Sequence, residues 1–288
     1  MKNSNTADRA SRASDPILQH QPFLEIRDLS ARFTSHLGEL DALKYVTFSL
    51  QRGEFVCLIG PSGCGKSTLL RIVAGLLAPS TGEVRLRGKL QTQPSNKVGL
   101  VFQDPTLLPW RTVHKNVALP LELAGKPAAT IQERVSELLG LVGLSDFEDE
   151  YPANLSGGMA QRAAIARALA QDPEALLLDE PFGALDALTR EVMSAELLRI
   201  WERTKRTVLM VTHSVEEAAL LSDRVVVLSA RPGRVIDIIP VPLSRPRSPR
   251  LLSTERLQAT AQRLRDALGC DNGVCADLQE CGSVQLAA

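Results

Sequence analysis

The chain has 288 residues, 44% of them hydrophobic and 23% charged, an ordinary composition for a globular protein with a substantial core. Lys plus Arg and Asp plus Glu number 33 each, so no net charge attracts nucleic acid, and we expect no nucleic-acid partner. The sequence contains no apolar run long enough for a membrane span and no apolar core of a secretory signal, which excludes an integral membrane protein and favours a soluble one.

The first elements in the chain are a leader and two strands. Residues 1–22 are rich in Ser, Asn and charge, which predicts a disordered leader. Residues 23–33 and 42–50 alternate apolar with polar side chains, as half-buried antiparallel strands do. We therefore expect an antiparallel β part at the N-terminal end of the fold.

The middle of the chain alternates buried strands with helices. Residues 55–60, 175–180 and 207–213 are almost continuously apolar, which is typical of parallel strands covered on both faces. Helical patterns follow at 66–79, 130–144 and 187–205, and two late strands at 223–229 and 233–241. This order predicts an α/β fold with a mainly parallel sheet.

The domain boundaries follow from composition. The stretch from about 104 to 170 is mainly helical and is predicted to be a subdomain inserted into a core that spans 23–242. Residues 243–288 are predicted to form a proline and arginine linker, a short helix at 254–268 and a tail with Cys270, Cys275 and Cys281. The spacing of these cysteines fits no common zinc pattern, so free thiols are favoured, and the role of the tail is left open.

A glycine-rich stretch at 60–68, "GPSGCGKST", follows the first buried strand and precedes a helix. This is the context of a P-loop, in which backbone N–H groups and the helix N-terminus hold phosphates. Lys66 is expected to reach the β- and γ-phosphates of a bound nucleotide and Ser67 to coordinate Mg²⁺. A chance glycine turn is the alternative, which the strand and helix on either side disfavour. The whole stretch is predicted to bind nucleotide: Gly60, Pro61, Ser62, Gly63, Cys64, Gly65, Lys66, Ser67 and Thr68.

Within the P-loop, we expect the Cys64 thiol to lie against the phosphates, so that alkylation inhibits the protein and ATP protects it.

Two adjacent carboxylates end the buried strand "ALLLDE". Asp179 is predicted to hold Mg²⁺, and Glu180 to act as the general base that polarises the attacking water. A solvated strand end is the alternative explanation for neighbouring acids.

A second glycine pair stands at 157–158, directly after Ser156 and before an apolar helical pattern. Ser is a favoured N-cap, so this stretch predicts a second helix N-terminus suited to an anion. The alternative is a capped helix that binds no ligand.

Taken together, "GPSGCGKST", "VFQDP", "LSGGMAQR", "LLLDEP", "ALDALTR" and "VTHS" resemble the motifs of ABC-type ATPases in order and spacing, over about residues 23–240. The resemblance implies a P-loop NTPase core and a head-to-tail homodimer. Ser156, Gly157 and Gly158 of one subunit would then contact the ATP held by the other. One departure is Met159, where many relatives have Gln.

The resemblance also implies further site residues. Gln103 matches the glutamine that senses Mg²⁺ and water, His213 the histidine at the γ-phosphate, and Asp186 the acid that crosses the dimer interface. Taken alone, each residue could be structural: a polar strand end, a structural histidine and a helix cap. Phe33 is the expected adenine platform. Tyr45 and Phe48 are the competing aromatics.

The predicted function is the ATP-hydrolysing subunit of an ABC importer, peripheral at the cytoplasmic face of the inner membrane. Three stretches, "LVFQDPTLLPWRTVHKNVALPLEL", "LSGGM" and "ARPGRV", look like those of the ATPases of nitrate, sulfonate and taurine importers. The resemblance implies integral membrane permease subunits and an external substrate-binding protein as partners. The apolar group within 104–117, which includes Trp110, is expected to dock the permease, with local packing as the alternative. The alternative functions are another importer subgroup or an ABC ATPase that acts on DNA or ribosomes. The sequence leaves the transported substrate and the permease composition open.

Overall fold

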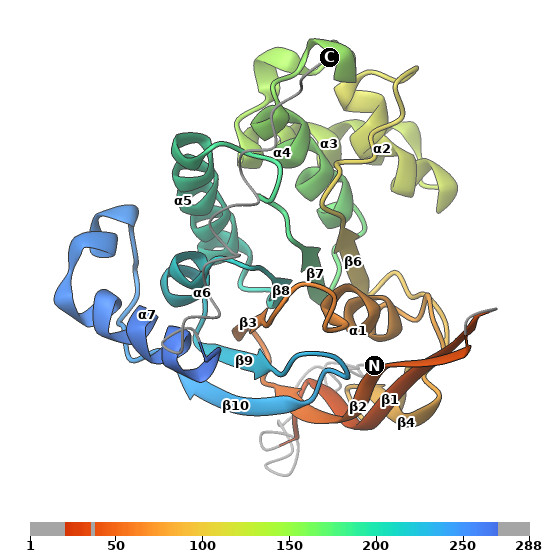
Figure 1. Ribbon diagram of the computed structural model, residues 1–288. Coiled ribbons are helices and arrows are strands. Elements are labelled where there is room, and N and C mark those ends of the chain that lie inside the picture. Colours follow the sequence, from red (N-terminus) through yellow and green to blue (C-terminus); the bar gives the residue numbers. More distant parts are fainter. Residues whose placement is uncertain (1–20, 36–37, 270–288) are drawn as a thin grey trace, which may run out of the picture.

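The computed structural model describes residues 21–35 and 38–269, so almost all of the predicted leader and the three tail cysteines lie outside the described residues. Within them the chain is a mixed α/β protein with a four-stranded antiparallel sheet and a six-stranded, mostly parallel sheet (Figure 1). This confirms the predicted fold class. No helix in the described part of the chain has the length and apolar character needed to cross a membrane.

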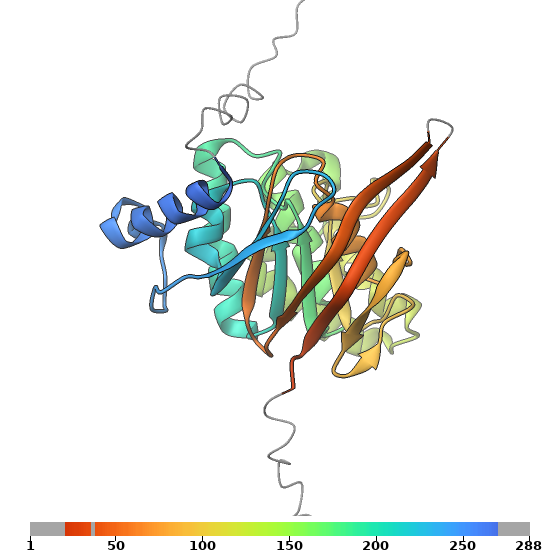
Figure 2. The ribbon, with the colours of Figure 1, turned by 60° about the horizontal axis from the view of Figure 1, so that its bottom comes forward.

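The antiparallel sheet has the strand order β2-β1-β4-β5. Its members are β1 (Leu24–Ser35), β2 (Gly38–Leu50), β4 (Thr81–Leu86) and β5 (Lys89–Leu90). Figure 2 shows β1 and β2 side by side as long strands. The sequence predicts β1 and β2 but not β4 and β5. In β4 only Val84 and Leu86 are buried apolar residues, which is too short an alternation to stand out.

The second sheet has the order β10-β9-β3-β8-β7-β6. Its members are β3 (Phe55–Ile59), β6 (Val98–Val101), β7 (Ala175–Asp179), β8 (Thr207–Val211), β9 (Arg224–Leu228) and β10 (Val235–Pro240). Every residue of β3, β7 and β8 is buried, as the continuous apolar runs predict. Only β10 runs antiparallel to its neighbour. Because the other five strands are parallel, their carboxyl ends meet at one edge of the sheet, where the site residues gather.

The helices beside this sheet include α1 (Lys66–Val73), α5 (Ala187–Thr204) and α6 (Val215–Leu221). The sequence pattern predicts that this helix continues to Pro79, but α1 ends at Val73. Gly75 follows with a φ of 75°, and a Cβ there would lie 2.5 Å from the Gln93 carbonyl oxygen. A left-handed glycine in close contact with another segment ends the helix.

The predicted helical stretch contains α2 (Val113–Leu123), α3 (Ala128–Val142) and α4 (Gly157–Leu169), with two short 3₁₀ turns at Ser145–Phe147 and Pro152–Asn154. These helices lie together at one end of the molecule, at the top of Figure 1. Val117, Val135 and Ile165 are fully buried and belong to the same apolar cluster as residues of the parallel sheet. Burial of these faces holds the helical stretch against the core.

The C-terminal part of the described chain packs against the core. It consists of a 3₁₀ turn at Pro249–Ser253 and α7 (Glu255–Ala267), whose Leu257, Ala261 and Leu264 are fully buried. The predicted linker is held by its arginines. Arg247 donates to the carbonyl oxygens of Leu220 and Ser222, and the Arg245 guanidinium lies 3.9 Å from the centre of the Trp201 ring. The segment up to Gly269 is thus packed structure rather than a free linker.

Candidate functional site

The P-loop joins the end of β3 to the start of α1, as predicted. Gly63 and Gly65 have φ values of 72° and 103°, in the left-handed region that favours glycine. A Cβ on Gly65 would also lie 2.9 Å from the Ala42 carbonyl oxygen. The loop and the N-terminus of α1 line a cleft of about 330 Å³. An anion in this cleft would face backbone N–H groups and the positive end of the helix.

Lys66 is a buried cation at the floor of this cleft. It is 6% exposed, and its ammonium group donates to the carbonyl oxygens of Gly60 (2.8 Å) and Pro61 (3.0 Å). Within the described ranges no carboxylate lies at hydrogen-bond distance from it. Because a buried charge needs a partner of opposite sign, this arrangement fits an anionic ligand such as a phosphate.

The Cys64 side chain lies beneath the loop rather than at its surface. The residue is fully buried, with its sulfur 4.0 Å from the Lys66 Nζ, and burial raises the pKa of its thiol. The expectation that this thiol lies open against the phosphates is therefore wrong for the side chain. The backbone N–H of Cys64 remains part of the loop.

We accordingly expect Cys57 and Cys64, both buried, to resist alkylation in the folded protein. Iodoacetamide labelling followed by peptide mass spectrometry should modify both thiols in denaturant and neither without it, whether or not ATP is present. Rapid labelling of Cys64 in the native protein that ATP prevents would contradict the buried position.

Two hard oxygen donors lie together beside the P-loop. The Ser67 hydroxyl donates to Asp179 Oδ1 at 2.9 Å. Asp179 is 9% exposed, and burial raises the pKa of its carboxyl group against the opposing effect of the Ser67 hydrogen bond. A hydroxyl and a buried carboxylate are ligands that Mg²⁺ prefers, so the pair fits the predicted metal site.

Glu180, His213 and Gln103 come from three different strand ends. Glu180 Oε2 lies 3.2 Å from His213 Nδ1. A Cβ added to Gly183 would lie 3.0 Å from Gln103 Nε2 and 3.5 Å from Glu180 Oε2, so the amide and the carboxylate border the same small space. Any larger residue at 183 would fill this space. The structure thus brings all three predicted catalytic residues together.

The hydrogen bond between Glu180 and His213 raises the pKa of the imidazole above its ordinary 6.5 and lowers that of the carboxyl group below its ordinary 4.5. The charged pair therefore stabilises the folded protein below about pH 6.5, and this contribution disappears as pH rises through the raised pKa of His213. The same contribution is also lost at low pH, when acidification through the lowered pKa of Glu180 protonates its carboxylate.

We expect an NMR titration of the ligand-free protein to give His213 a pKa above 6.5, and Glu180→Gln to bring it back toward 6.5. The His213 signal is assigned by its loss in His213→Ala. An unchanged pKa in Glu180→Gln would show that the two side chains do not interact in solution.

Ser156 is the N-cap of α4, as predicted, and its hydroxyl accepts from the Met159 N–H at 3.3 Å. Ser156 and Gly157 are exposed, while Gly158 packs against α5. A Cβ on Gly158 would lie 3.3 Å from Thr189 Cγ2, so the glycine has a packing role as well. In the described residues none of the three lines the P-loop cleft. The exposed N-terminus of α4 therefore does not complete the cleft of its own chain.

Asp186 is the N-cap of α5 and accepts from the Thr189 N–H at 3.0 Å and its hydroxyl at 2.6 Å. This confirms the structural alternative of a helix cap. The capping bonds use the carboxylate but leave Asp186 exposed, where a second subunit has access to it.

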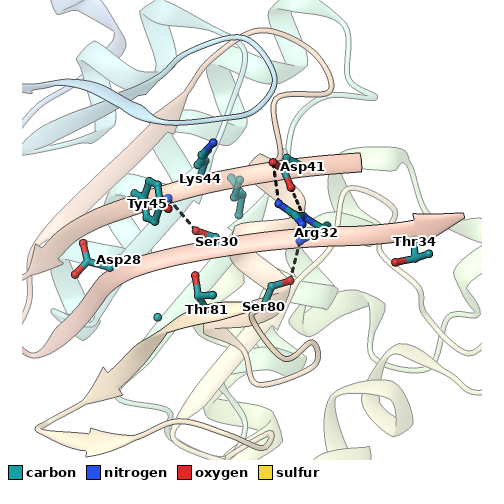
Figure 3. Close-up of a pocket in the computed structure, with 11 residues that line it drawn as sticks. Asp28, Ser30, Arg32, Thr34, Asp41, Lys44, Tyr45, Ser80 and Thr81 are labelled. Carbon is teal, nitrogen blue, oxygen red and sulfur yellow. Dashed lines mark hydrogen bonds and ion pairs between the residues drawn. The ribbon is translucent and has the colours of Figure 1, made fainter. Parts of the chain in front are cut away.

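Phe33 lines the P-loop cleft together with Leu40 and is 39% exposed. Tyr45 lies elsewhere, in a depression of about 640 Å³ over the antiparallel sheet (Figure 3). In that depression Arg32 is paired with Asp41, at 2.6 Å. Phe48 is buried in the core. Of the three aromatics, Phe33 alone has a face available beside the P-loop for a planar base.

Sequence reasoning missed several residues that hold the site. Gln161 of α4 is buried and donates to the Phe102 carbonyl oxygen, while Arg167 donates to those of Pro105 and Thr106. They bind the segment after Gln103 to the helical stretch. Arg231 lines the P-loop cleft. Two of these residues lie in stretches that carry a family resemblance, Gln161 in "LSGGMAQR" and Arg231 in "ARPGRV", but neither stretch indicates the role of the side chain.

Comparisons with known proteins agree with this geometry. The ABC transporter domain family matches residues 43–183. An uncharacterized ABC transporter ATP-binding protein of Methanocaldococcus jannaschii is 52% identical over 78% of this chain and 84% of its own length. The chain belongs to the ATP-binding proteins of ABC transporters. Other members include the aliphatic sulfonates import ATP-binding protein of Bacillus thuringiensis, 47% identical over 82% of this chain and 92% of its own.

The taurine import ATP-binding protein of Roseobacter denitrificans is 48% identical to this ATPase over 74% of the chain and 80% of its own length. Among solved structures, the dimeric structure of a bacterial ABC transporter cassette matches with a TM-score of 0.68 and 33% identity, over 77% of this chain and all of that one. A post-hydrolysis dimer of an ATP-binding cassette with ADP and phosphate matches with a TM-score of 0.67. The protein is thus an ABC ATPase that hydrolyses ATP in a transporter.

Proposed function

We propose that this ABC ATPase works as a homodimer that powers import of a small anion, such as an aliphatic sulfonate, taurine or nitrate. The observation that carries the import assignment is the set of relatives named for sulfonate and taurine import, 47–48% identical over at least 80% of their own lengths. Nitrate is included as a candidate substrate only because of the resemblance of the sequence stretches.

The proposed roles of the residues are supported by their positions. The P-loop N–H groups and Lys66 bind the triphosphate, and Ser67 and Asp179 hold Mg²⁺, which supplies charge neutralisation on the phosphates when bound. Glu180 accepts a proton from the attacking water, while His213 orients the Glu180 carboxylate through its hydrogen bond. Gln103 borders the same space. It links the presence of Mg²⁺ and water there to the position of the helical stretch.

The signature residues serve the partner subunit in this proposal. Ser156, Gly157 and Gly158 stay outside the P-loop cleft of their own chain and are open at the start of α4. An exposed helix N-terminus attracts an anion, and the γ-phosphate held by a second copy supplies it. ATP then bridges two subunits, and its hydrolysis releases them. The dimeric state of two similar cassettes supports the dimer itself.

The membrane partner is proposed to dock beside Gln103, around Trp110. This side chain is 72% exposed, whereas Leu107 packs on the core and Leu108 is half-buried. Asn116 fixes the segment, accepting from the Leu108 N–H and donating to the carbonyl oxygens of Leu108 and Arg111. An exposed Trp on a rigid segment suits a protein contact. The ATPase would then be peripheral at the cytoplasmic face of the inner membrane.

The test is purification of the tagged ATPase from its own membranes, followed by ATPase assays of the complex with the external binding protein. Permease subunits should co-purify, and one of alkanesulfonate, taurine or nitrate should stimulate hydrolysis. Trp110→Ala should release the permease, whereas Tyr45→Ala, also an exposed aromatic, should not. Co-purification with ribosomes or DNA instead would overturn the import function, and stimulation by an unrelated solute would move the ATPase to another importer subgroup.

A further inference from the structure

The loop between β9 and β10, residues 229–234, carries the sequence "SARPGR". The Ser229 N–H donates to the Arg234 carbonyl oxygen, and the Arg234 N–H donates to the Ser229 hydroxyl oxygen. These bonds close the loop on itself. The loop therefore has a defined shape where it meets the nucleotide cleft.

At Gly233 this loop lies between the P-loop and β2, in contact with both. Its N–H donates to the Ala42 carbonyl oxygen at 2.9 Å, and its own carbonyl oxygen accepts from the Lys44 N–H at 3.0 Å. A Cβ on Gly233 would lie 2.1 Å from the Cys64 carbonyl oxygen. Only glycine permits this approach, so the loop is in direct contact with the backbone of the P-loop.

Arg231 extends from the same loop onto the P-loop. Its Nε donates to the Gly63 carbonyl oxygen at 2.9 Å, and a Cβ on Gly63 would lie 2.9 Å from its Nη2. Arg231 is exposed and lines the cleft beside Ser62. In the described ranges its guanidinium forms no ion pair. A positive charge without a carboxylate partner thus lies at the edge of the phosphate cleft.

The hydrogen bond from Arg231 acts on the Gly63–Cys64 peptide unit of the P-loop. Because a trans peptide is planar, the bond that fixes the Gly63 carbonyl oxygen also fixes the opposite direction, in which the Cys64 N–H points. That N–H now donates to the Pro61 carbonyl oxygen at 3.3 Å, which is long for such a bond. A phosphate oxygen can replace this weak partner.

We propose that Arg231 is a positioning residue for the phosphates of the bound nucleotide. It orients the Gly63–Cys64 peptide and adds a positive charge to the cleft, so that it favours nucleotides with a di- or triphosphate over the bare nucleoside. The inference rests on the proposed nucleotide site at the P-loop.

The test measures the affinities of ATP, ADP and adenosine for wild-type protein and for Arg231→Ala, by competition with a fluorescent ATP analogue. Loss of a charge-assisted hydrogen bond should weaken ATP and ADP binding about ten-fold, with adenosine unchanged. KM for ATP should rise with little change in kcat, and Arg231→Lys should recover part of the affinity. Arg234→Ala, in the same loop, is the matched control and should bind all three ligands normally.

Phe33→Ala provides the contrast, because loss of the adenine platform should weaken adenosine as much as ATP. The proposal is overturned if Arg231→Ala binds ATP normally, if it loses ATP and adenosine equally, or if it lowers only Tm. If Arg231→Ala does not fold, Arg231→Lys serves as the test. The proposal is then overturned if Arg231→Lys binds ATP and ADP with full affinity and has an unchanged KM. Failure of the wild-type protein to bind ATP would instead refute the proposed nucleotide site.

Discussion

Glu180→Gln is expected to bind ATP and to lose turnover by a factor of about 10²–10⁴, the usual contribution of a general base. Glutamine has the shape of glutamate but cannot take the proton from water. Since ATP is no longer consumed, the dimer that it bridges should persist. Phosphate release and sedimentation, each with and without ATP, measure the two effects.

The control for Glu180→Gln is Glu133→Gln, which makes the same change at an exposed position of α3. It should leave turnover and sedimentation unchanged. If Glu180→Gln were monomeric in ATP and turned over normally, Glu180 would not be the base.

Ser156→Arg is expected to leave ATP binding by the single subunit intact and to reduce hydrolysis at least about 100-fold, the scale of losing one preorganised donor. The substitution places a long side chain at the exposed start of α4, where the partner's phosphate is expected, and not in the cleft of its own chain. Lys66→Ala should instead weaken ATP binding itself. Filter binding and phosphate release separate the two defects.

Loss of the helix cap is a second effect of Ser156→Arg, of about 1 kcal/mol in the free energy of unfolding. Ser156→Asp separates the two, because aspartate caps a helix as well as serine does while its charge opposes a phosphate. It should keep a normal Tm and still lose hydrolysis. Ser156→Arg would argue against a role in the partner's site if its ATP affinity fell as far as that of Lys66→Ala.

The parts of the fold predicted from sequence are those that local patterns determine. The continuous apolar runs at β3, β7 and β8 identify buried parallel strands, and the residues after them meet at one edge because the strands are parallel. The P-loop and the helix caps Ser156 and Asp186 depend on neighbours in the chain. A short window of sequence contains all the information that these features need.

The rest depends on contacts between distant segments. Whether the Cys64 thiol faces the cleft or the core follows from the glycine turns around it, and the contact of Arg231 with Gly63 joins residues 168 positions apart. Arg245 and Arg247 belong to the stretch predicted as a proline and arginine linker, but they bind carbonyl oxygens at the end of α6. No local pattern of charge or hydrophobicity distinguishes these arginines from exposed ones.

The central claim is that each catalytic centre combines the P-loop of one subunit with Ser156, Gly157 and Gly158 of another. The most direct test is the specific ATPase activity of the purified protein over a dilution series, with the oligomeric state followed by sedimentation at saturating ATP. We expect activity per molecule to fall in parallel with the dimer fraction and to vanish for the monomer. Full activity per molecule in a strictly monomeric solution would contradict the claim.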